Sequence, residues 1–278
     1  LVPLNWRLAP RELLYMIRDC GAIALIVDTP YIEQCEALRS EVPGCTFVAL
    51  YEDAPATWST LPGLLRNAKG EDHFRGVGLD QPLLIVYTSG TSGAPKGVVL
   101  AQQAILANAL NSTLMQGMTG EDTILTVLPL FHVGGLTIQT MTAFYHGATV
   151  ILHRVFDPQP MLDCLVQDKP TLTVILPAQM RPLRQLPGWE AATLQLRAVV
   201  TGSCVIPDDM VRYWSDRGIP LLNMYGASET APVAIHQSMS DVSITAGTVG
   251  FPAMHCEIRI VDEAGRDCDD DEPGEILV

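Results

Sequence analysis

Short apolar runs alternate along this chain with segments that have helical spacing. Runs at residues 22–27, 46–51 and 123–128 are brief and apolar, which predicts strands. Residues 10–20, with apolar side chains on one face, and residues 30–40 have the pattern of helices. Strands that alternate with helices form βαβ units. We therefore predict an α/β fold with mostly parallel sheets flanked by helices.

The same alternation continues through most of the chain. Helices are expected at residues 102–116, 136–146, from 158, 177–185 and 207–217, and strands at 149–152, 171–176, 196–200 and 220–224. In the first of these helices, Asn108, Asn111 and Ser112 are expected on a solvated or groove-facing side. Beyond Gly247 the pattern becomes short alternating runs, which predicts a small antiparallel β region near the C-terminal end.

Composition narrows the function classes. The 278 residues are 48% hydrophobic and 17% charged, enough for a large core. The net charge is −14 and no basic cluster is present, which argues against a nucleic-acid partner. ATP remains compatible because it requires only a local positive site.

The cysteines and one long uncharged segment indicate the cellular location that we expect for the protein. Seven cysteines are scattered without a CxxC pair, so we expect reduced thiols and a cytoplasmic protein. Residues 123–153 lack Asp, Glu, Lys and Arg, but Pro129, Gly134, Gly135 and Gln139 interrupt them, and we predict no transmembrane segment. Because both ends resemble strands, we expect a fragment of a longer protein.

Residues 88–97, TSGTSGAPKG, have the chemistry of a phosphate-binding loop. Glycine lets backbone N–H groups face an anion, hydroxyl groups add donors, and the lysine adds a positive charge. The candidate phosphate ligands are Thr88, Ser89, Gly90, Thr91, Ser92, Gly93 and Lys96.

Two other interpretations of this loop are open. A P-loop phosphotransferase would need Gly-Lys-Ser/Thr before a helix, whereas Pro95 precedes the lysine and Gly97 follows it. A flexible linker would not lie between two apolar runs, here residues 83–87 and 98–100. The flanking runs instead predict two strands joined as in a hairpin.

Three later segments add candidate residues at the ends of predicted strands. His132 precedes Gly134 and Gly135, where a ligand or another backbone can come close; an isolated core histidine is the alternative. The turn at 201–204 carries Gly202, Ser203 and Cys204, and ligands in α/β sheets bind beyond the carboxyl ends of strands. Cys204 as a nucleophile is the alternative to pocket lining, but no neighbouring group would activate it.

The segment that ends in Tyr225-Gly226-Ala227-Ser228-Glu229 completes the set. Tyr225 offers a flat face for a purine, and Gly226 permits close approach. Glu229 is an oxygen ligand suited to Mg²⁺, although a charge at a helix N-terminus is the alternative.

Together these motifs resemble those of the adenylate-forming enzymes, the superfamily of acyl-CoA synthetases, amino-acid adenylation domains and firefly luciferase. The loop at 88–97 is similar to the family's phosphate-binding signature. Residues 128–136 and 225–229 are similar to its second and third motifs in the expected order, with Ser228 in place of the usual Thr. The resemblance implies the fold of the large N-terminal domain of these enzymes. It also implies nucleotide- and acyl-binding subdomains over residues 1–240, truncated at the N-terminus, and a β-rich subdomain over 241–278, cut before a C-terminal lid domain.

The resemblance also assigns roles. It implies catalytic roles for Lys96, His132 and Glu229, with the metal on Glu229. Beyond the loop at 88–97, nucleotide contacts are expected from Gly202, Ser203, Asn223, Met224, Tyr225, Gly226, Ala227 and Ser228. The acyl group is expected against His132, Gly135, Gly202, Cys204 and Ala227.

The implied function is that of an acyl-CoA synthetase, an acid–thiol ligase that uses ATP, Mg²⁺ and coenzyme A to convert a carboxylic acid into its thioester. Amino-acid adenylation domains have an Asp after the Phe of the second motif, whereas His132 follows Phe131 here, so we expect a fatty or aromatic acid. An amino-acid adenylation domain and a luciferase-like enzyme are the alternatives. The resemblance implies that the family's adenylation lysine lies beyond residue 278. A third alternative is therefore that the chain is a nucleotide-binding module that binds ATP without turnover. A homodimer is left open.

Overall fold

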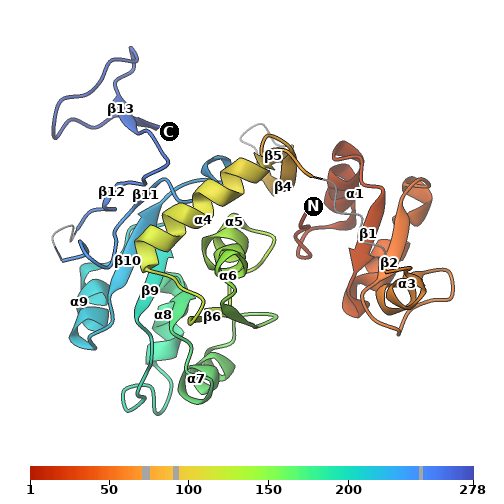
Figure 1. Ribbon diagram of the computed structural model, residues 1–278, viewed down its shortest axis with the longest axis horizontal. Coiled ribbons are helices and arrows are strands. Elements are labelled where there is room, and N and C mark those ends of the chain that lie inside the picture. Colours follow the sequence, from red (N-terminus) through yellow and green to blue (C-terminus); the bar gives the residue numbers. More distant parts are fainter. Residues whose placement is uncertain (71–75, 90–93, 244–246) are drawn as a thin grey trace. The chain divides into compact units, whose positions relative to one another are not determined.

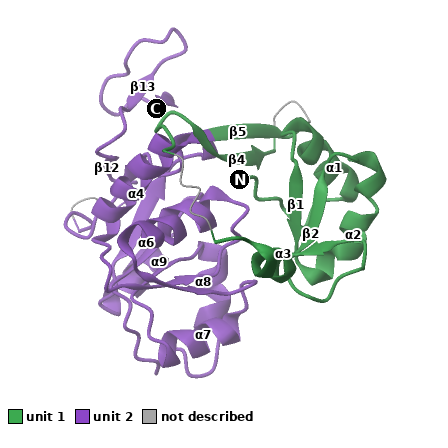
Figure 2. Cartoon of the chain, turned by 45° about the vertical axis from the view of Figure 1, so that its right-hand side comes forward, with its two compact units in different colours: residues 1–99 green, residues 100–278 purple. Residues whose placement is uncertain are grey.

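A computed structural model describes residues 1–70, 76–89, 94–243 and 247–278 (Figure 1). The chain divides into two compact units, Leu1–Val99 and Leu100–Val278, with the boundary inside strand β5 (Figure 2). The two units are defined by the contacts within each of them. They do not test the predicted subdomains 1–240 and 241–278, which stay a prediction.

The first unit contains a small parallel sheet packed against helices. Its strands run in the order β1-β2-β3, with Ala24 opposite Thr46 at the start of the parallel pairing. Leu13 and Ile17 of α1 and Phe47 of β2 contribute to one apolar core because each is almost fully buried. The elements are α1 (Pro10–Asp19), β1 (Ala24–Val27), η1 (Thr29–Tyr31), α2 (Ile32–Glu36), η2 (Arg39–Glu41), β2 (Thr46–Ala49), β3 (Ser59–Thr60) and α3 (Leu61–Asn67).

The two strands expected on either side of the predicted phosphate-binding loop are present. β4 (Pro82–Thr88) and β5 (Lys96–Ala101) pair in a two-stranded sheet. The Tyr87 hydroxyl on β4 donates to Asp19 Oδ2 of α1 at 2.5 Å. A Cβ at Gly97 would lie 2.9 Å from Ile85 Cγ2 and 3.3 Å from the Tyr87 ring. Glycine after Lys96 therefore lets β4 side chains pack directly on the β5 backbone.

In the second unit the described residues form a seven-stranded sheet in the order β12-β11-β10-β9-β8-β6-β7. The five strands from β7 to β10 are parallel, and β11 and β12 add an antiparallel edge. The predicted mostly parallel α/β fold is thus confirmed. The strands are β6 (Thr123–Thr126), β7 (Thr149–Leu152), β8 (Leu172–Val174), β9 (Ala198–Gly202), β10 (Leu221–Tyr225), β11 (Ile235–His236) and β12 (Phe251–Pro252).

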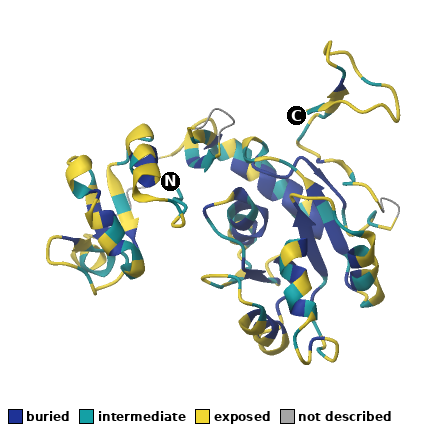
Figure 3. Ribbon diagram, turned by 180° about the vertical axis from the view of Figure 1, so that it is seen from behind, coloured by how far each residue is buried: buried dark blue, intermediate teal, exposed yellow. Residues whose placement is uncertain are grey.

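Strand alternation divides the core of this unit between two faces. Leu125, Val199 and Leu221 face Met161, Met180 and Trp214 of α7 (Pro158–Gln167), α8 (Pro177–Arg184) and α9 (Asp208–Asp216). Their neighbours Ile124, Val200 and Leu222 face Met115 of α4 (Gln102–Gln116) and Ala143 of α6 (Met141–His146). Both faces are therefore covered, and the strands are mostly buried (Figure 3).

Two details differ from the sequence-based expectation. The expected helix at 136–146 consists of a π-helix, η3 (Leu136–Thr140), followed by α6, and the short α5 (Val133–Gly135) precedes it. The expectation that Asn108, Asn111 and Ser112 face solvent or a groove is wrong, because all three are at most 2% exposed.

The C-terminal part contains the expected antiparallel pair, β13 (Arg259–Val261) with β14 (Glu275–Leu277). Figure 1 shows this pair apart from the large sheet of the same unit. Over the described ranges, the protein has no helix with the length and apolarity needed to cross a bilayer.

Candidate functional site

A pocket of about 880 Å³ opens at the carboxyl ends of β9 and β10. Because the two strands are parallel, Gly202 at the end of β9 lies beside Met224 near the end of β10. Ser203 has φ +65°, and this left-handed turn leads the chain away from the sheet. The pocket is lined by Ser203, Cys204, Val205, Ile206, Asp208, Val211, Arg212, Leu221, Asn223, Met224, Tyr225, Gly226, Gln237, Val242, Gly247, Thr248 and Val249.

Six residues expected at the site from the sequence line this pocket, from two segments that are distant along the chain. Ser203 and Cys204 come from the turn after β9, and Asn223, Met224, Tyr225 and Gly226 come from β10 and the turn after it. Gly202 itself is buried, and a Cβ there would lie 2.6 Å from the Met224 carbonyl oxygen. The close approach at Gly202 is thus between two strands.

Hydrogen bonds hold the polar wall of the pocket. The Asn223 N–H donates to Gln237 Oε1 at 2.9 Å, and the Gln237 N–H donates to the Asn223 carbonyl at 2.9 Å. Asn223 Nδ2 donates to the Thr248 carbonyl at 3.2 Å. The Asn223 backbone is therefore held by Gln237, which directly follows β11, and its carboxamide is oriented by the Thr248 carbonyl.

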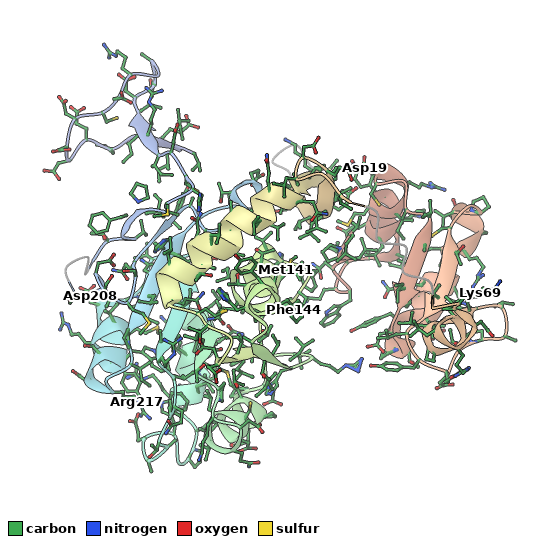
Figure 4. The ribbon with its side chains drawn as sticks, viewed as in Figure 1. Asp19, Lys69, Met141, Phe144, Asp208 and Arg217 are labelled. Atoms are coloured by element: carbon green, nitrogen blue, oxygen red, sulfur yellow. The ribbon has the colours of Figure 1, made fainter. Side chains whose placement is uncertain are left out.

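The pocket residues contributed by α9 and by the segments after β11 were not predicted from the sequence. Asp208 and Arg212 of α9 are pocket residues one helical turn apart, and Asp208 lies at the start of the helix (Figure 4). Their spacing of four residues, directly after the turn at 202–204, was the available signal. Gln237 and Thr248 gave no local signal because their place depends on strand pairing.

The turn after β10 requires its glycine. A Cβ at Gly226 would lie 1.4 Å from the Pro232 carbonyl oxygen, so the 226 and 232 backbones are in contact. The Ala227 N–H donates to Thr230 Oγ1 at 2.9 Å, and the turn continues as η4 (Ser228–Thr230). Glu229 is exposed in this turn. Its carboxylate is thus available to a ligand.

The segment with His132 makes a similar close contact. His132 is exposed at the start of α5, and its ring lies 4.6 Å from that of Phe131. A Cβ at Gly135 would lie 2.4 Å from the Pro129 carbonyl oxygen. At Gly135 the absence of a side chain lets the backbone of Pro129 come close. Close approach of a ligand or of another backbone was expected here, and the structure shows the backbone contact.

The predicted phosphate-binding loop, residues 88–97, is described in part. Thr88 ends β4, and Ser89 and Lys96 are exposed on either side of the loop, Lys96 as the first residue of β5. Gly90, Thr91, Ser92 and Gly93 lie outside the described residues. Lys96 belongs to the first unit, whereas His132 and Glu229 belong to the second, so their convergence on one cleft stays a prediction.

A comparison with known protein families identifies the chain. The model of the family described as AMP-binding enzyme matches residues 1–278. The chain belongs to the AMP-binding enzyme family. The resemblance inferred from the three motifs is thereby confirmed.

Individual relatives of this family are CoA ligases. The chain is 42% identical over 279 residues to the indoleacetate–CoA ligase of Aromatoleum aromaticum, covering 100% of this chain and 54% of that protein. It is 30% identical over 282 residues to the feruloyl-CoA synthase of an Amycolatopsis species, again covering 100% of this chain and 54% of that protein. The chain thus spans about half the length of the curated relatives it matches.

Solved structures share the fold. The crystal structure of the anthranilate CoA ligase AuaEII in complex with anthranoyl-AMP superimposes with a TM-score of 0.89 at 23% sequence identity. The superposition covers 99% of this chain and 53% of that chain. The expected adenylate-forming fold is confirmed by this similarity.

Proposed function

We propose that the full-length gene product is an AMP-forming acyl-CoA synthetase. The observation that carries this proposal is the pocket at the ends of β9 and β10, in a chain that matches the AMP-binding family over its whole length. In the proposed reaction, a substrate carboxylate is first coupled to AMP. The sulfur of coenzyme A then attacks the acyl carbonyl, forming a C–S bond while AMP leaves.

The adenylation step requires charge neutralisation and alignment. A carboxylate oxygen bonds to the α-phosphorus of ATP, and the bond from that phosphorus to the pyrophosphate oxygen breaks. In this proposal Lys96, Thr88 and Ser89, with the undescribed loop residues between them, bind the phosphates. Tyr225 stacks on the purine at the rim of the pocket.

Glu229 is the residue we propose to hold Mg²⁺. Over the described part of the chain, no three His, Cys, Asp or Glu side chains form a ready set of metal ligands. This suits Mg²⁺, which is commonly held by one or two carboxylates together with substrate phosphates and water. When bound, the ion would neutralise phosphate charge.

We propose an aromatic acid as the substrate. The two relatives described above are named for indoleacetate and ferulate, both aromatic acids. His132 stands where amino-acid adenylation domains have an Asp, so no carboxylate is supplied at that position for a substrate ammonium group. We further propose a cytoplasmic location because every cysteine is a free thiol. The homodimer remains a prediction to be checked by light scattering.

Pyrophosphate exchange tests the function. The full-length gene product is assayed with indoleacetate, ferulate, palmitate and tryptophan, with thioester formation measured after addition of coenzyme A. We expect the fastest exchange with the aromatic acids. Exchange with tryptophan alone would establish an amino-acid adenylation domain, and γ-phosphate transfer would favour a phosphotransferase.

One variant tests the proposed metal ligand, and one binding measurement tests the non-enzyme alternative. Glu229→Gln keeps the side-chain size and removes the charge, so we expect a weaker Mg²⁺ dependence of exchange with the fold retained. Calorimetry of the 278-residue chain with ATP measures binding separately. Binding without exchange in the full-length protein would establish a nucleotide-binding module in place of a ligase.

A further inference from the structure

Helix α4 carries buried polar side chains that connect distant segments of the second unit. Asn108, Asn111, Ser112 and Gln116 are each at most 2% exposed. Buried polar groups are normally hydrogen-bonded, so the partners of these side chains show what the helix holds. Figure 1 shows α4 alongside α5 and α6, which follow the His132 segment.

Asn108 uses both ends of its amide. Its Nδ2 donates to the Thr137 carbonyl at 2.9 Å, and its Oδ1 accepts from the Val233 N–H at 3.0 Å. Thr137 lies in the π-helix η3, which follows His132 and Gly135. Val233 lies shortly after the turn that carries Tyr225 and Glu229. A single buried side chain therefore joins the two motif segments.

Thr137 makes a second, independent connection. Its hydroxyl, which is 0% exposed, lies 2.9 Å from the Val133 carbonyl and 2.9 Å from the Ala231 carbonyl. A hydroxyl group has one proton, so the two acceptors share it. The backbone directly after His132 is thus linked to the backbone directly after Thr230.

The segment at 231–233 also sets the position of the turn before it. Gly226 packs on the Pro232 carbonyl oxygen, with 1.4 Å between that oxygen and a Cβ built at Gly226. Thr230 Oγ1 donates to the same carbonyl at 2.9 Å. A displacement of 231–233 would therefore move the turn that carries Tyr225 and Glu229.

We propose that Asn108 and Thr137 are positioning residues that fix the His132 segment against the Tyr225–Glu229 turn. Neither residue is one of the proposed ligand contacts. The catalytic part of this inference rests on the proposed function. Because reaction rates depend on alignment to within about 1 Å, loosening these ties should lower kcat more than it raises KM.

Two matched pairs of variants separate positioning from loss of a buried hydrogen bond. Thr137→Val removes the hydroxyl and preserves the shape. Its control, Thr173→Val, makes the same change at a residue that is also 0% exposed, whose hydroxyl donates to the Leu125 carbonyl at 2.8 Å. Asn108→Ala is paired with Asn111→Ala, since Asn111 is equally buried but bonds to Val233 and His255 and not to η3.

The first measurement is hydrogen exchange followed by mass spectrometry on the 278-residue chain, which requires no catalytic activity. We expect Thr137→Val and Asn108→Ala to raise exchange in both 132–140 and 225–234. We expect Thr173→Val to change neither segment, and Asn111→Ala to leave 132–140 unchanged. Faster exchange confined to 132–140 in Thr137→Val would overturn the proposed connection.

The second measurement is steady-state kinetics of the full-length gene product. We expect kcat to fall about tenfold or more in Thr137→Val and Asn108→Ala, with KM for ATP within about twofold of wild type. A fall in kcat no greater than that of Thr173→Val would overturn the positioning role. An inactive wild-type protein would refute the proposed function, and hydrogen exchange would still decide whether the two segments are tied.

Discussion

Two adjacent glycines in α5 provide a test of the structure around His132. Alanine should lower the free energy of unfolding at Gly135 but not at Gly134. At Gly135, a Cβ would lie 2.4 Å from the Pro129 carbonyl oxygen and 2.7 Å from that of Leu128. At Gly134, the nearest atom would be Leu128 Cδ1 at 4.0 Å, an ordinary contact. The clashing atoms at Gly135 belong to the backbone, so no side-chain rotation relieves them.

The size of the effect follows from these distances. Real Cβ contacts essentially never fall below 3.0 Å, so Gly135→Ala must separate the two backbones by at least 3.0 − 2.4 = 0.6 Å. Overpacking of this kind typically costs about 1–3 kcal/mol. The gain in helix propensity on replacing glycine, at most about 1 kcal/mol, applies to both variants. We therefore expect Gly135→Ala to be about 1–3 kcal/mol less stable than Gly134→Ala.

Urea unfolding of the 278-residue chain measures this difference, provided that both variants unfold with the same slope. In the full-length protein, Gly135→Ala should also lower kcat, because His132 lies three residues before the displaced backbone. If the two variants had unfolding free energies within about 0.5 kcal/mol of each other, the close contact between Gly135 and Pro129 would be refuted.

Two further predictions concern the pocket and the ion pair between the buried Asp122 and the partly exposed Arg197. Burial raises the pKa of Asp122, but hydrogen bonds from the Thr171 hydroxyl, the Thr119 N–H and Arg197 together outweigh it and hold this pKa below its ordinary value of 3.8. Asp122→Asn should therefore cost about 2–3 kcal/mol at pH 7. The difference from wild type should shrink as the pH falls below about 3.8 and through the lowered pKa, and urea unfolding at pH 7 and pH 3 checks this; a constant difference would contradict it. Cys204, exposed in the pocket, should react with iodoacetamide before the buried Cys164, whose pKa burial raises to about 12. ATP should slow this reaction, and unchanged labelling would show that nucleotide does not bind there.

Much of the fold was determined by local sequence pattern. Short apolar runs predicted β1, β2 and β6. In β2 and β6 this pattern has a clear cause, because a strand buried on both faces needs apolar side chains in succession. β1 was located by the same pattern although Ile26 is exposed. Motif glycines also had local meaning: Gly97, Gly135 and Gly226 each stand where a Cβ would meet another part of the protein at 2.9 Å or less. The sequence thus located the turns of the candidate site.

Only the tertiary structure decided which polar residues are internal and which line the pocket. The polar character of Asn108 and Asn111 suggested a solvated or groove-facing side. In the structure, Asn108 accepts a hydrogen bond from the Val233 N–H, and Asn111 donates to the Val233 carbonyl and accepts from the His255 N–H, all more than 120 residues away. Gln237 reaches the pocket because β11 pairs with β10. Burial of a polar group is tolerated when a partner is present, and long-range packing supplies that partner, so hydrophobic periodicity within a short segment cannot reveal it.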